Sequence, residues 1–549
     1  MQQPALSFAA GPTDVPLLDY TIGEALEVAR NRWPDDLALV SVHQEIRWSW
    51  SELCDEVDSV ACGLLELGVR AGDRVGIWAP NCAEWTVVQF ATARIGAILV
   101  NINPAYRLSE VEYALNKVGC SVLVTTPAFK TSRYVDMLRE LGRERLPQLR
   151  HVITLGDEEH DGFQRWSTLR IAIDAGALKR AGATLAPRQP INIQFTSGTT
   201  GFPKGATLTH RNILNNGYFN AHVLRLSPAD RICTPVPLYH CFGMVLGNLA
   251  ALTSGAAMVY PAEAFDPRFV LEAVQAERCT TLYGVPTMFI ALLAHPELDK
   301  FDVSSLRTGI MAGSPCPVSA MRGVMKRLGM SEVTIGYGMT ETSPLTTQTA
   351  PDDPIETRVS TVGRAHPHAE AKIVGPDGVT LPLGEQGEYC SRGYAVMEGY
   401  WDDPQRTAEA IDGDGWMHSG DLGTMDAEGY VRITGRLKDM VIRGGENIYP
   451  REIEEFFHGH SAVEDVAVVG VPDERMGEEL CAWIKLRRGE SLGEQDLREF
   501  CKGRIAHFKI PRHIRFVSEF PTTATGKVQK FVIRERMTEE LAANARAGS

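Results

Sequence analysis

Short apolar runs alternate with stretches of helical pattern between residues 20 and 340. The short runs are typical of buried strands, and the longer stretches predict helices. Strands are predicted at residues 74–78, 96–100 and 121–125, and helices at residues 82–95 and 108–118. Because helices that alternate with strands connect parallel neighbours, this order predicts α/β layers with a largely parallel sheet.

The pattern changes after about residue 360. Short strands separated by glycines are predicted at residues 371–374, 387–391 and 430–434, which indicates a smaller β-rich unit. In the last hundred residues the pattern is mixed again, with helices predicted at 450–457 and 497–505 and strands at 463–470 and 482–486. We therefore predict a large N-terminal domain, residues 1–435, of layered α/β subdomains plus the β-rich subdomain. A small α+β C-terminal domain, residues 436–549, would follow a boundary near Gly435–Asp439.

Length and composition agree with a soluble protein of several units. With 549 residues the chain is too long for one hydrophobic core, which stops growing at roughly 250–300 residues. Its 44% hydrophobic and 23% charged residues are typical of a globular protein. The formal net charge of −14 argues against a nucleic-acid partner, because such a partner requires a broad basic face. Small nucleotides remain compatible with it, since a few cations and backbone amides suffice to hold phosphates.

Cysteine usage and apolar stretches bear on location. The eleven cysteines are scattered and form no C-x-x-C pair, so we expect neither a disulfide framework nor a zinc site, and a reducing compartment fits. Residues 1–17 contain no basic residue, unlike a secretory or transit signal. The most apolar long stretch, residues 245–260, is too short and too polar to span a bilayer. We predict a cytoplasmic protein without a membrane span.

A loop rich in Gly, Ser and Thr follows a strand predicted at residues 191–195. It reads TSGTTGFPKG over residues 196–205. Glycines let backbone N–H groups approach an anion, the hydroxyls add donors and the lysine adds a positive charge. The loop is not a Walker A motif, because Lys204 is followed by glycine instead of Ser or Thr. We predict a phosphate-binding loop, whose expected contacts are Thr196, Ser197, Gly198, Thr199, Thr200, Gly201 and Lys204.

This loop resembles the signature for the ATP phosphates in adenylate-forming enzymes. That superfamily includes acyl-CoA synthetases, adenylation domains of peptide synthetases and beetle luciferases. Further segments resemble the other motifs of the superfamily in the same order, and the resemblance spans residues 20–535. It implies the fold expected above, with a mobile C-terminal domain that rotates about a hinge. It also implies that the chain uses ATP, Mg²⁺ and coenzyme A.

The second segment, GYGMTE at residues 336–341, implies contacts with adenine and phosphate. In the superfamily its tyrosine stacks on adenine, its threonine touches the α-phosphate and its glutamate helps to hold Mg²⁺. The physical chemistry agrees, because a purine offers a face to an aromatic ring and Mg²⁺ favours a carboxylate together with phosphate oxygens. The nucleotide contacts implied here are Gly336, Tyr337, Gly338, Met339 and Thr340, with Glu341 as the metal ligand. Gly313, Ser314 and Pro315 resemble the segment that lines adenine.

Two more segments resemble the ribose and coenzyme A motifs. WMHSGD at residues 416–421 ends in Asp421, which corresponds to an aspartate that accepts the ribose hydroxyls. Arg436 corresponds to an arginine that contacts the ribose, and Lys438 resembles the hinge residue. RGGENIYP at residues 443–450 resembles the passage for the pantetheine arm of coenzyme A. The residues assigned to coenzyme A are Gly444, Gly445 and Glu446.

The last segment, PTTATGK at residues 521–527, ends in Lys527. Taken alone, such a lysine is usually a surface residue. Its place in this segment resembles the lysine that bridges the carboxylate and the α-phosphate during adenylation. The resemblance therefore assigns Lys527 to catalysis and to ATP binding, and it assigns catalytic roles to Thr196 and Glu341 as well.

PLYHCFG at residues 237–243 precedes an apolar helix predicted at residues 244–252. In the superfamily this region forms one wall of the acyl pocket, with the histidine near the carboxylate, so His240 is a further catalytic candidate. The candidate residues are apolar or small, which predicts an uncharged acyl tail. No aspartate lies between residues 235 and 252 to pair with a substrate amine, which argues against an amino acid. The predicted pocket residues are His240, Phe242, Gly243, Gly247, Met311 and Met339.

These observations predict an AMP-forming acyl-CoA synthetase that converts a carboxylic acid to an acyl-AMP and then to an acyl-CoA. The local sequence resembles the medium-chain branch, which favours a medium-chain fatty acid, and the superfamily suggests a homodimer. One alternative is a fatty acyl-AMP ligase that loads a carrier protein, although no obvious insertion of the kind found in those relatives lies between residues 363 and 435. Others are a ligase for a short branched, sulfur-containing or aryl acid and a luciferase-like oxidase. A nucleotide sensor without catalysis is disfavoured by Lys527, Glu341 and Asp421.

Overall fold

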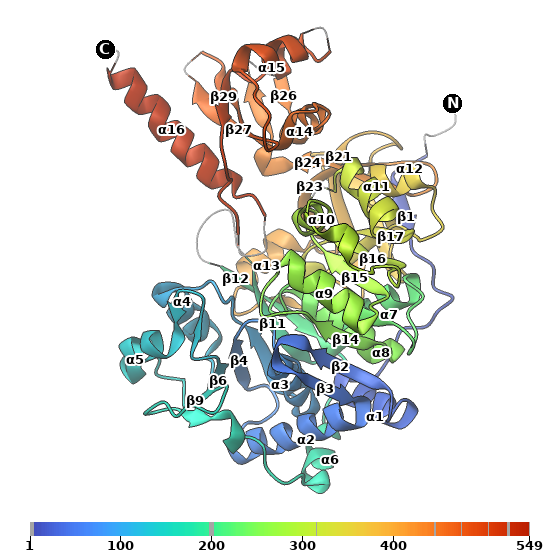
Figure 1. Ribbon diagram of the computed structural model, residues 1–549, viewed down its shortest axis with the longest axis vertical. Helices are drawn as coiled ribbons and strands as arrows, with labels where there is room; N and C mark the ends of the chain where they lie inside the picture. Colours follow the sequence, from blue (N-terminus) through green and yellow to red (C-terminus); the bar gives the residue numbers. More distant parts are fainter. Residues whose placement is uncertain are drawn as a thin grey trace. The chain divides into compact units, whose positions relative to one another are not determined.

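The chain folds into two compact units in the computed structural model (Figure 1). The larger unit comprises Ala9–Ala371 and Ser391–Met417, and the smaller comprises Met1–Phe8, Lys372–Cys390 and His418–Ser549. The structure describes residues 5–196, 203–314, 316–443, 446–473, 475–502, 504–523 and 527–547. The domain boundary expected between residues 435 and 436 falls inside the smaller unit, at the end of a strand, and stays a prediction.

The first large sheet has eight strands in the order β10-β9-β6-β4-β5-β11-β12-β22. The strands are β10 (Gln164–Arg165), β9 (His151–Thr154), β6 (Val122–Thr125), β4 (Arg74–Trp78), β5 (Ile98–Asn101), β11 (Pro190–Thr196), β12 (Lys204–Thr209) and β22 (Gly399–Tyr400). Strands β10 to β11 are parallel, whereas β12 and β22 are antiparallel to their neighbours. The last strand, β22, comes from a segment about two hundred residues beyond β12 along the chain.

The second large sheet has nine strands in the order β19-β18-β17-β16-β15-β13-β14-β2-β3. The strands are β19 (Arg364–Ala365), β18 (Leu345–Gln348), β17 (Glu332–Gly338), β16 (Thr308–Ala312), β15 (Thr281–Gly284), β13 (Arg231–Cys233), β14 (Ala257–Tyr260), β2 (Leu37–Ser41) and β3 (Ile46–Ser49). The six strands from β17 to β2 are parallel. The predicted α/β class is therefore confirmed.

Helices connect these strands and cover the sheets. They are α1 (Ile22–Arg32), α2 (Trp50–Glu66), α3 (Ala83–Ile95), α4 (Leu108–Val118), α5 (Tyr134–Arg145), α6 (Ala175–Gly182), α7 (His210–Val223), α8 (Ala250–Ser254), α9 (Pro267–Glu277), α10 (Pro286–Leu293), α11 (Val318–Arg327), α12 (Ile355–Ser360) and α13 (Pro404–Ala410). Helix α3 contacts β4 and β5 of the first sheet and β2 of the second, so it lies between the sheets. This position explains why apolar residues cover nearly all of its faces.

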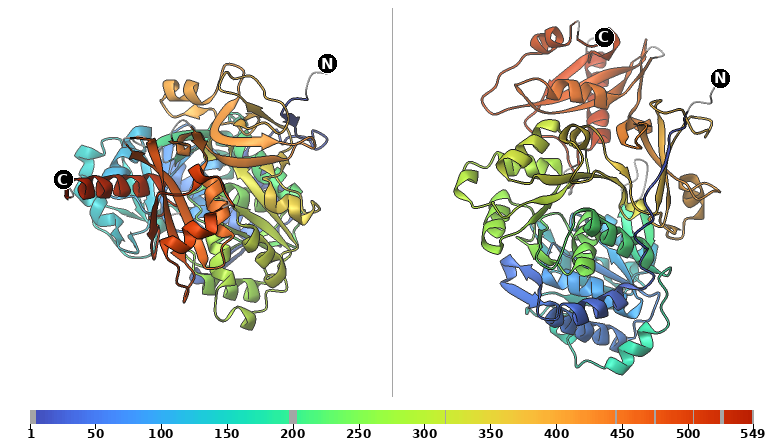
Figure 2. Two further views of the ribbon diagram at one scale, coloured as in Figure 1. Left: turned by 90° about the horizontal axis from the view of Figure 1, so that it is seen from above. Right: turned by 90° about the vertical axis from the view of Figure 1, so that its right-hand side faces the viewer.

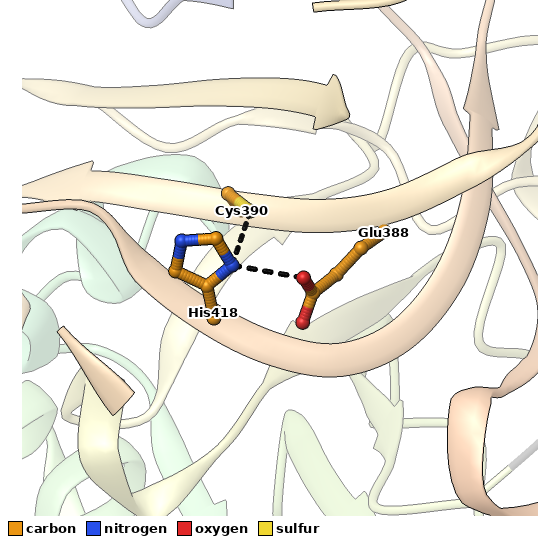
Figure 3. A group of neighbouring side chains, drawn as sticks. All are labelled: Glu388, Cys390 and His418. Carbon is orange, nitrogen blue, oxygen red and sulfur yellow. Dashed lines mark hydrogen bonds and ion pairs between the residues drawn. The ribbon is translucent and has the colours of Figure 1, made fainter. Parts of the chain in front are cut away.

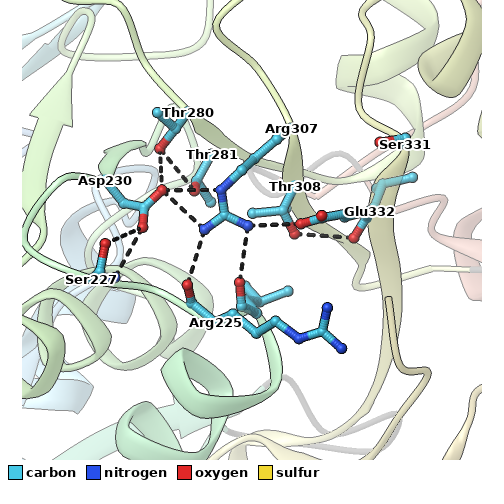
Figure 4. A network of polar contacts seen from close by, with 12 residues as sticks. Arg225, Ser227, Asp230, Thr280, Thr281, Arg307, Thr308, Ser331 and Glu332 are labelled. Atoms are coloured by element: carbon cyan, nitrogen blue, oxygen red, sulfur yellow. Dashed lines mark hydrogen bonds and ion pairs between the residues drawn. The ribbon is translucent and has the colours of Figure 1, made fainter. Parts of the chain in front are cut away.

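A polar network joins the amino ends of the parallel strands in the second sheet (Figure 4). Arg307, just before β16, lies 3.0 Å from Asp230 and 2.7 Å from Glu332 at its guanidinium nitrogens. Asp230 precedes β13, and its buried carboxylate also accepts a hydrogen bond of 2.7 Å from Thr280, the residue before β15. The guanidinium donates further to the carbonyl of Arg225. Each charge at this edge is therefore compensated by another protein group.

The smaller unit holds two β-sheets. One has the order β1-β20-β21-β23-β24, with β1 (Phe8–Ala10), β20 (Ala369–Val374), β21 (Gly387–Gly393), β23 (Met417–Met425) and β24 (Val431–Arg436), and the unit boundary passes along its strands. The other has the order β26-β25-β28-β27 with β29 beside β28. Its elements are β25 (Val441–Arg443), β26 (Glu446–Ile448), α14 (Pro450–His458), β27 (Val463–Asp473), β28 (Gly477–Leu486), α15 (Glu494–Cys501), β29 (His513–Phe516) and α16 (Lys530–Ala547).

Strand β27 separates two small apolar cores. Val466 and Val468 pack with α14 and α15, whereas Ala467 and Val469 pack with α16 on the other face, where the long C-terminal helix crosses the sheet (Figure 2). This alternation is the two-residue period of a strand buried on both faces. The helix expected at residues 497–505 instead occupies Glu494–Cys501, because the carboxylate of Asp496 accepts the N–H of Gly493 and starts the helix earlier. Within the described ranges, no helix combines the length and the apolar character that crossing a membrane requires.

Candidate functional site

The predicted phosphate loop connects two paired antiparallel strands of the first sheet. Thr196 ends β11 and lies opposite Lys204, the first residue of β12. The hydroxyl of Thr196 lies 3.3 Å from the carboxylate of Glu341, which comes from the second sheet's side of the larger unit. The loop residues Ser197, Gly198, Thr199, Thr200 and Gly201 lie outside the described residues. The two ends of the loop are thus fixed beside Glu341.

Glu341 is a buried carboxylate in a short 3-10 turn, Thr340–Thr342, that follows β17. Only 6% of the residue is exposed. Its carboxylate accepts hydrogen bonds from two hydroxyls, those of Thr196 and Tyr400, and the second is 2.8 Å long. Among the residues that the structure describes, no arginine, lysine or histidine forms an ion pair with it. A buried carboxylate of this kind is costly unless a cation compensates it, so the turn fits a site for a cation.

Tyr400 joins Glu341 to the lysine of the phosphate loop. The Lys204 ammonium donates to the Tyr400 hydroxyl at 2.8 Å and lies 4.1 Å from the centre of the Tyr400 ring. The hydroxyl in turn donates to Glu341. Burial, and then the neighbouring carboxylate, raise the pKa of Tyr400 far above its usual value, so the hydroxyl keeps its proton. Tyr400 therefore couples a cation and an anion that belong to different segments.

Tyr400 was not among the residues predicted from the sequence. The residue stands in the two-residue strand β22, whose register places it opposite Ala206 of β12. Backbone hydrogen bonds fix this position, because the N–H of Trp401 donates to Gly205 and the N–H of Glu398 donates to Thr207. A short Gly-Tyr-Trp segment resembles a turn in sequence, and nothing in it indicates an edge strand beside the phosphate loop.

The segment at residues 336–341 occupies the carboxyl end of β17. Gly336 pairs with Ala312 of β16, so residues 313–314, which follow β16, lie at the same edge. A side chain at Gly338 would meet the carbonyl oxygen of Pro344 at 1.8 Å, which explains the glycine. Tyr337 is half-buried, Thr340 is buried, and Gly313 and Ser314 form an exposed to half-buried bend, while Pro315 lies outside the described residues.

His240 lies beside this edge. The thiol of the next residue, Cys241, is 3.8 Å from the hydroxyl of Thr340, which brings the two segments together. The ring nitrogen Nδ1 of His240 accepts the N–H of Phe242 at 3.2 Å. Because Nδ1 is an acceptor, the neutral ring carries its proton on Nε2 and can offer it as a donor, a tautomer assigned from the hydrogen bond.

The apolar pocket candidates divide into two groups. Phe242, which stacks on Tyr283 at a centroid distance of 5.8 Å, belongs to the same core cluster as Ile310, and Met339 packs against it. Met311 belongs to a different cluster, under the helices of the other face. Successive residues of a strand point to opposite faces, so Met311 packs on the other face of β16 from its neighbours Ile310 and Ala312, and its place in the acyl pocket stays a prediction.

The two glycines of the predicted pocket pack against the protein itself. Phe242–Leu249 forms a π-helix where an apolar helix was expected. A side chain on Gly243 would lie 2.5 Å from the carbonyl oxygen of Pro237, and one on Gly247 would lie 3.2 Å from Thr234. Their small size therefore allows close packing of the π-helix, which does not test a role in acid binding.

The predicted ribose residues form a pair on the β23–β24 hairpin of the smaller unit. Asp421 lies opposite Arg436 in register, and the guanidinium Nε donates to the carboxylate at 2.9 Å. The Asp421 side chain is 14% exposed, against 60% for Arg436. The ion pair therefore holds the Asp421 carboxylate in place, and both side chains remain partly accessible to solvent.

The other predictions in the smaller unit are placed only in part. Lys438 lies in a 3-10 turn after β24. Gly444 and Gly445 lie outside the described residues, and Glu446 begins β26. Lys527 is half-buried, and its N–H donates to the hydroxyl of Thr523 at 3.1 Å. The structure thus describes where these residues lie within the unit, and their roles stay predictions.

Comparison with known proteins supports a nucleotide site. Residues 26–401 match the family model described as AMP-binding enzyme, and residues 452–527 match the AMP-binding enzyme C-terminal domain. The chain belongs to the AMP-binding enzyme family. The first match contains Thr196, Lys204, Glu341 and Tyr400, and the second ends at Lys527.

Full-length relatives share this organisation. The chain is 47% identical to Bacillus subtilis YngI over 539 residues, which are 95% of this chain and 98% of YngI. It is 46% identical over 556 residues to the mitochondrial medium-chain acyl-CoA ligase ACSF2 of Danio rerio, covering 97% of this chain and 91% of that one. Among solved structures, the anthranilate CoA ligase AuaEII in complex with anthranoyl-AMP superposes with a TM-score of 0.85 at 28% identity, covering 96% of this chain and 99% of that one.

Proposed function

We propose that this AMP-binding enzyme is an ATP-dependent acyl-CoA synthetase. It joins a carboxylic acid to coenzyme A and releases AMP and pyrophosphate. The observation that carries the proposal is the chain of contacts from the half-buried Lys204 through the buried Tyr400 to the buried Glu341, at the base of a glycine-rich loop. Relatives named as a medium-chain acyl-CoA ligase and an anthranilate CoA ligase support the choice of acceptor and reaction.

The chemical problem of the first step is charge. A carboxylic acid has a pKa of about 4–5, so it is ionised at neutral pH and needs no general base. Its anion must nevertheless approach a polyphosphate. Glu341 is the described carboxylate that fits Mg²⁺, and the ion, when bound with ATP, would neutralise part of the phosphate charge. Lys204 supplies a fixed positive charge at the start of β12.

In this first step a carboxylate oxygen forms a bond to the α-phosphorus. The bond from that phosphorus to the bridging oxygen breaks, and pyrophosphate leaves with the electron pair. The hydroxyl of Thr196 and the predicted bridging ammonium of Lys527 would stabilise charge as it develops on the α-phosphate oxygens. Tyr400, protonated throughout, keeps Lys204 and Glu341 in register while this happens.

In the second step the thiol of coenzyme A attacks the acyl carbon. A carbon–sulfur bond forms, the carbon–oxygen bond breaks, and AMP leaves with its electron pair while the thiol proton passes to solvent. A thiol has a pKa of about 8.5, so a minority is thiolate at neutral pH, and the activated acyl group makes that minority sufficient. We propose that Lys438 serves as the hinge that exchanges Lys527 for the Gly444–Gly445 segment between the steps.

We propose a medium-chain fatty acid as the substrate. Phe242 and Met339 belong to one apolar cluster or pack against it, and Thr340 directly follows Met339, which supports an apolar acyl site here. No acidic residue occurs between residues 235 and 252, which disfavours a substrate amine. His240, with its proton on Nε2, would donate to the substrate carboxylate.

Product analysis tests the proposal. The enzyme is incubated with ATP, Mg²⁺, coenzyme A and carboxylates from acetate to palmitate, together with aryl and sulfur-containing acids. We expect AMP and an acyl-CoA, with the largest turnover for medium chain lengths. AMP without a thioester would instead favour a ligase that loads a carrier protein, and a maximum with benzoate or anthranilate would overturn the medium-chain assignment.

Location and assembly are separate proposals. We propose a cytoplasmic location, which is supported by eleven cysteines that form no disulfide, ten of them buried. We also propose a homodimer. Fractionation of cells and light scattering of the purified protein test these two proposals independently of the activity.

A further inference from the structure

We propose that Glu388 and His418 are positioning residues for Asp421, the carboxylate assigned above to the nucleotide ribose. This inference rests on the proposed function. Glu388 lies on β21 and His418 on the adjacent strand β23, three residues before Asp421. Neither residue was assigned a role by the motifs of the sequence, and both act through the turn that carries Asp421.

The first observation is that β21 holds this turn at two points. The Glu388 carboxylate oxygen Oε1 accepts the N–H of Gly420 at 2.9 Å. The hydroxyl of Ser419 donates to the carbonyl of Tyr389 at 2.6 Å and accepts the N–H of Asp421 at 3.0 Å. Gly420 has a φ of +70°, a conformation that glycine adopts without strain. Because a glycine is free to leave such a conformation, the external hydrogen bonds are what define the position of the following aspartate.

The second observation is that His418 orients Glu388 (Figure 3). The ring nitrogen Nδ1 lies 2.8 Å from the other carboxylate oxygen, Oε2, and 3.5 Å from the thiol of Cys390. With Oε2 bound to the ring, Oε1 is directed to Gly420. The side chains of His418 and Glu388 are 30% and 19% exposed, so the contact is shielded from water in part. The carboxylate is therefore a bridge with one partner at each oxygen.

A metal site explains the same three side chains less well. Glu388, Cys390 and His418 provide oxygen, sulfur and nitrogen donors within 4.8 Å of one another. Tetrahedral zinc, at about 2.0–2.1 Å from nitrogen and oxygen ligands, holds those ligand atoms about 3.3 Å apart. The observed 2.8 Å between Nδ1 and Oε2 is the separation of a charge-assisted hydrogen bond. The other carboxylate oxygen, Oε1, accepts the N–H of Gly420, a contact that a metal site does not require.

The consequence is a preorganised ribose site. Arg436 holds one oxygen of Asp421 at 2.9 Å from its Nε, and the Glu388 bridge holds the backbone of the turn. A carboxylate that is fixed before the nucleotide arrives loses little conformational freedom on binding. The hydrogen bonds of the two ribose hydroxyls then contribute more to the affinity for the nucleotide. Loosening the turn should weaken only the part of the affinity that comes from those hydroxyls.

The test compares AMP with 2′,3′-dideoxy-AMP, which lacks both hydroxyls, by calorimetric titration of the full-length enzyme. Glu388→Ala and His418→Ala should weaken AMP binding about tenfold, since the ordering cost of one or more groups returns on binding. Binding of the dideoxy analogue should stay unchanged. Glu388→Gln keeps an acceptor for Gly420, and His418→Asn keeps a donor for Glu388, so both should restore most of the AMP affinity. Glu370→Ala, which removes an ion pair of 2.6 Å with Arg392 on neighbouring strands, is the matched control and should change neither affinity.

Three outcomes would overturn the proposal. If the variants bind both nucleotides equally more weakly, Glu388 and His418 have a general structural role. If the affinity for neither nucleotide falls, the two residues do not contribute to nucleotide binding. A wild-type enzyme that does not distinguish AMP from its dideoxy analogue would mean that Asp421 does not contact the ribose. Acyl-CoA production by the same preparation tests the proposed function separately, so failure of one is distinguishable from failure of the other. Should Glu388→Ala not fold, His418→Ala and its Asn counterpart give the same comparison.

Discussion

The two ends of strand β17 carry glutamates with opposite surroundings. Glu332, at the amino end, forms an ion pair of 2.7 Å with Arg307, which also binds Asp230. Glu341, just beyond the carboxyl end, is more deeply buried and receives only hydroxyl donors among the described residues. At the amino end the protein compensates its own charges, whereas at the carboxyl end it leaves a charge for something else to compensate.

This difference separates stability from function. A network of mutually compensated charges around the buried Asp230 joins the ends of four strands and needs no ligand. A buried carboxylate without a cation costs free energy in the unliganded protein, and that cost is recovered when a cation with its phosphates arrives. Ligands of open parallel sheets bind outside the carboxyl ends of the strands, which is where Glu341 lies. Substitutions at the carboxyl end of β17 should therefore reduce turnover more than substitutions at its amino end.

Glu341→Gln should produce the largest loss. The amide keeps the size of the side chain and its contacts with hydroxyls but removes the negative charge, so adenylation should fall by about 10²–10³-fold, as for other electrostatic groups of an active site. Acid-dependent exchange of pyrophosphate into ATP measures this step. Glu332→Gln, at the amino end of β17, is the matched control, and a comparable loss in both variants would contradict the assignment of the two ends.

Lys527→Ala should affect only one half of the reaction. We expect adenylation to fall by about 10²-fold, a typical loss for one preorganised donor. Formation of the thioester from supplied acyl-AMP should be spared. Quenched-flow assays of each half-reaction measure both rates, with the exposed Lys502 changed to Ala as the control. Equal losses in the two half-reactions would contradict a specific role of Lys527 in adenylation.

Tyr400→Phe removes the hydroxyl that contacts Glu341, beyond the carboxyl end of β17, and keeps the aromatic ring. Lys204 and Glu341 then lose their common partner, so we expect turnover to fall about tenfold, equivalent to one hydrogen bond with a charged group. The Mg²⁺ concentration for half-maximal rate should rise as well. Tyr394→Phe is a matched control, because Tyr394 lies six residues before Tyr400 and its buried hydroxyl accepts a hydrogen bond of 3.3 Å from Asn216 of α7, away from Lys204 and Glu341. An unchanged Mg²⁺ dependence would argue against coupling through Tyr400.

Asp230→Asn should change turnover least and stability most. It removes one of the two carboxylates that pair with the Arg307 guanidinium, and the ion pair with Glu332 remains, so the free energy of unfolding should fall by about 2 kcal/mol, as for a hydrogen bond with a charged group. Turnover at low temperature should remain that of the wild type, because no residue of the network lies at the carboxyl edge. Denaturant titration and steady-state rates measure the two effects. Loss of turnover without loss of stability would show that the amino end also has a functional role.

Local patterns predicted much of the fold. The helix expected at residues 108–118 is α4 with the same bounds, and the strand expected at residues 74–78 is β4. The strand expected at residues 191–195, before the phosphate loop, is β11, whereas β12 after the loop was not predicted. These features depend on neighbours along the chain, which a sequence displays directly.

Features that depend on distant pairing could not be predicted in this way. Tyr400 reaches Lys204 through the pairing of β22 with β12, and no local pattern specifies that register. The face to which Met311 points depends on the register of β16, because a shift by one residue moves every side chain of a strand to the other face of the sheet. The π-helix at Phe242–Leu249 has the same apolar composition as the helix that was expected. The residue type alone also could not show which of the two glutamates, Glu332 or Glu341, has a compensating cation in the protein.

We propose that the site at the carboxyl end of β17 forms an acyl-adenylate before coenzyme A takes part. The most direct measurement is mass spectrometry of the products formed from ATP, Mg²⁺ and octanoate without coenzyme A. We predict octanoyl-AMP and pyrophosphate, and the conversion of that octanoyl-AMP to octanoyl-CoA and AMP when coenzyme A is added. Formation of ADP and phosphate, or of octanoyl-CoA without any octanoyl-AMP or pyrophosphate exchange, would contradict the account.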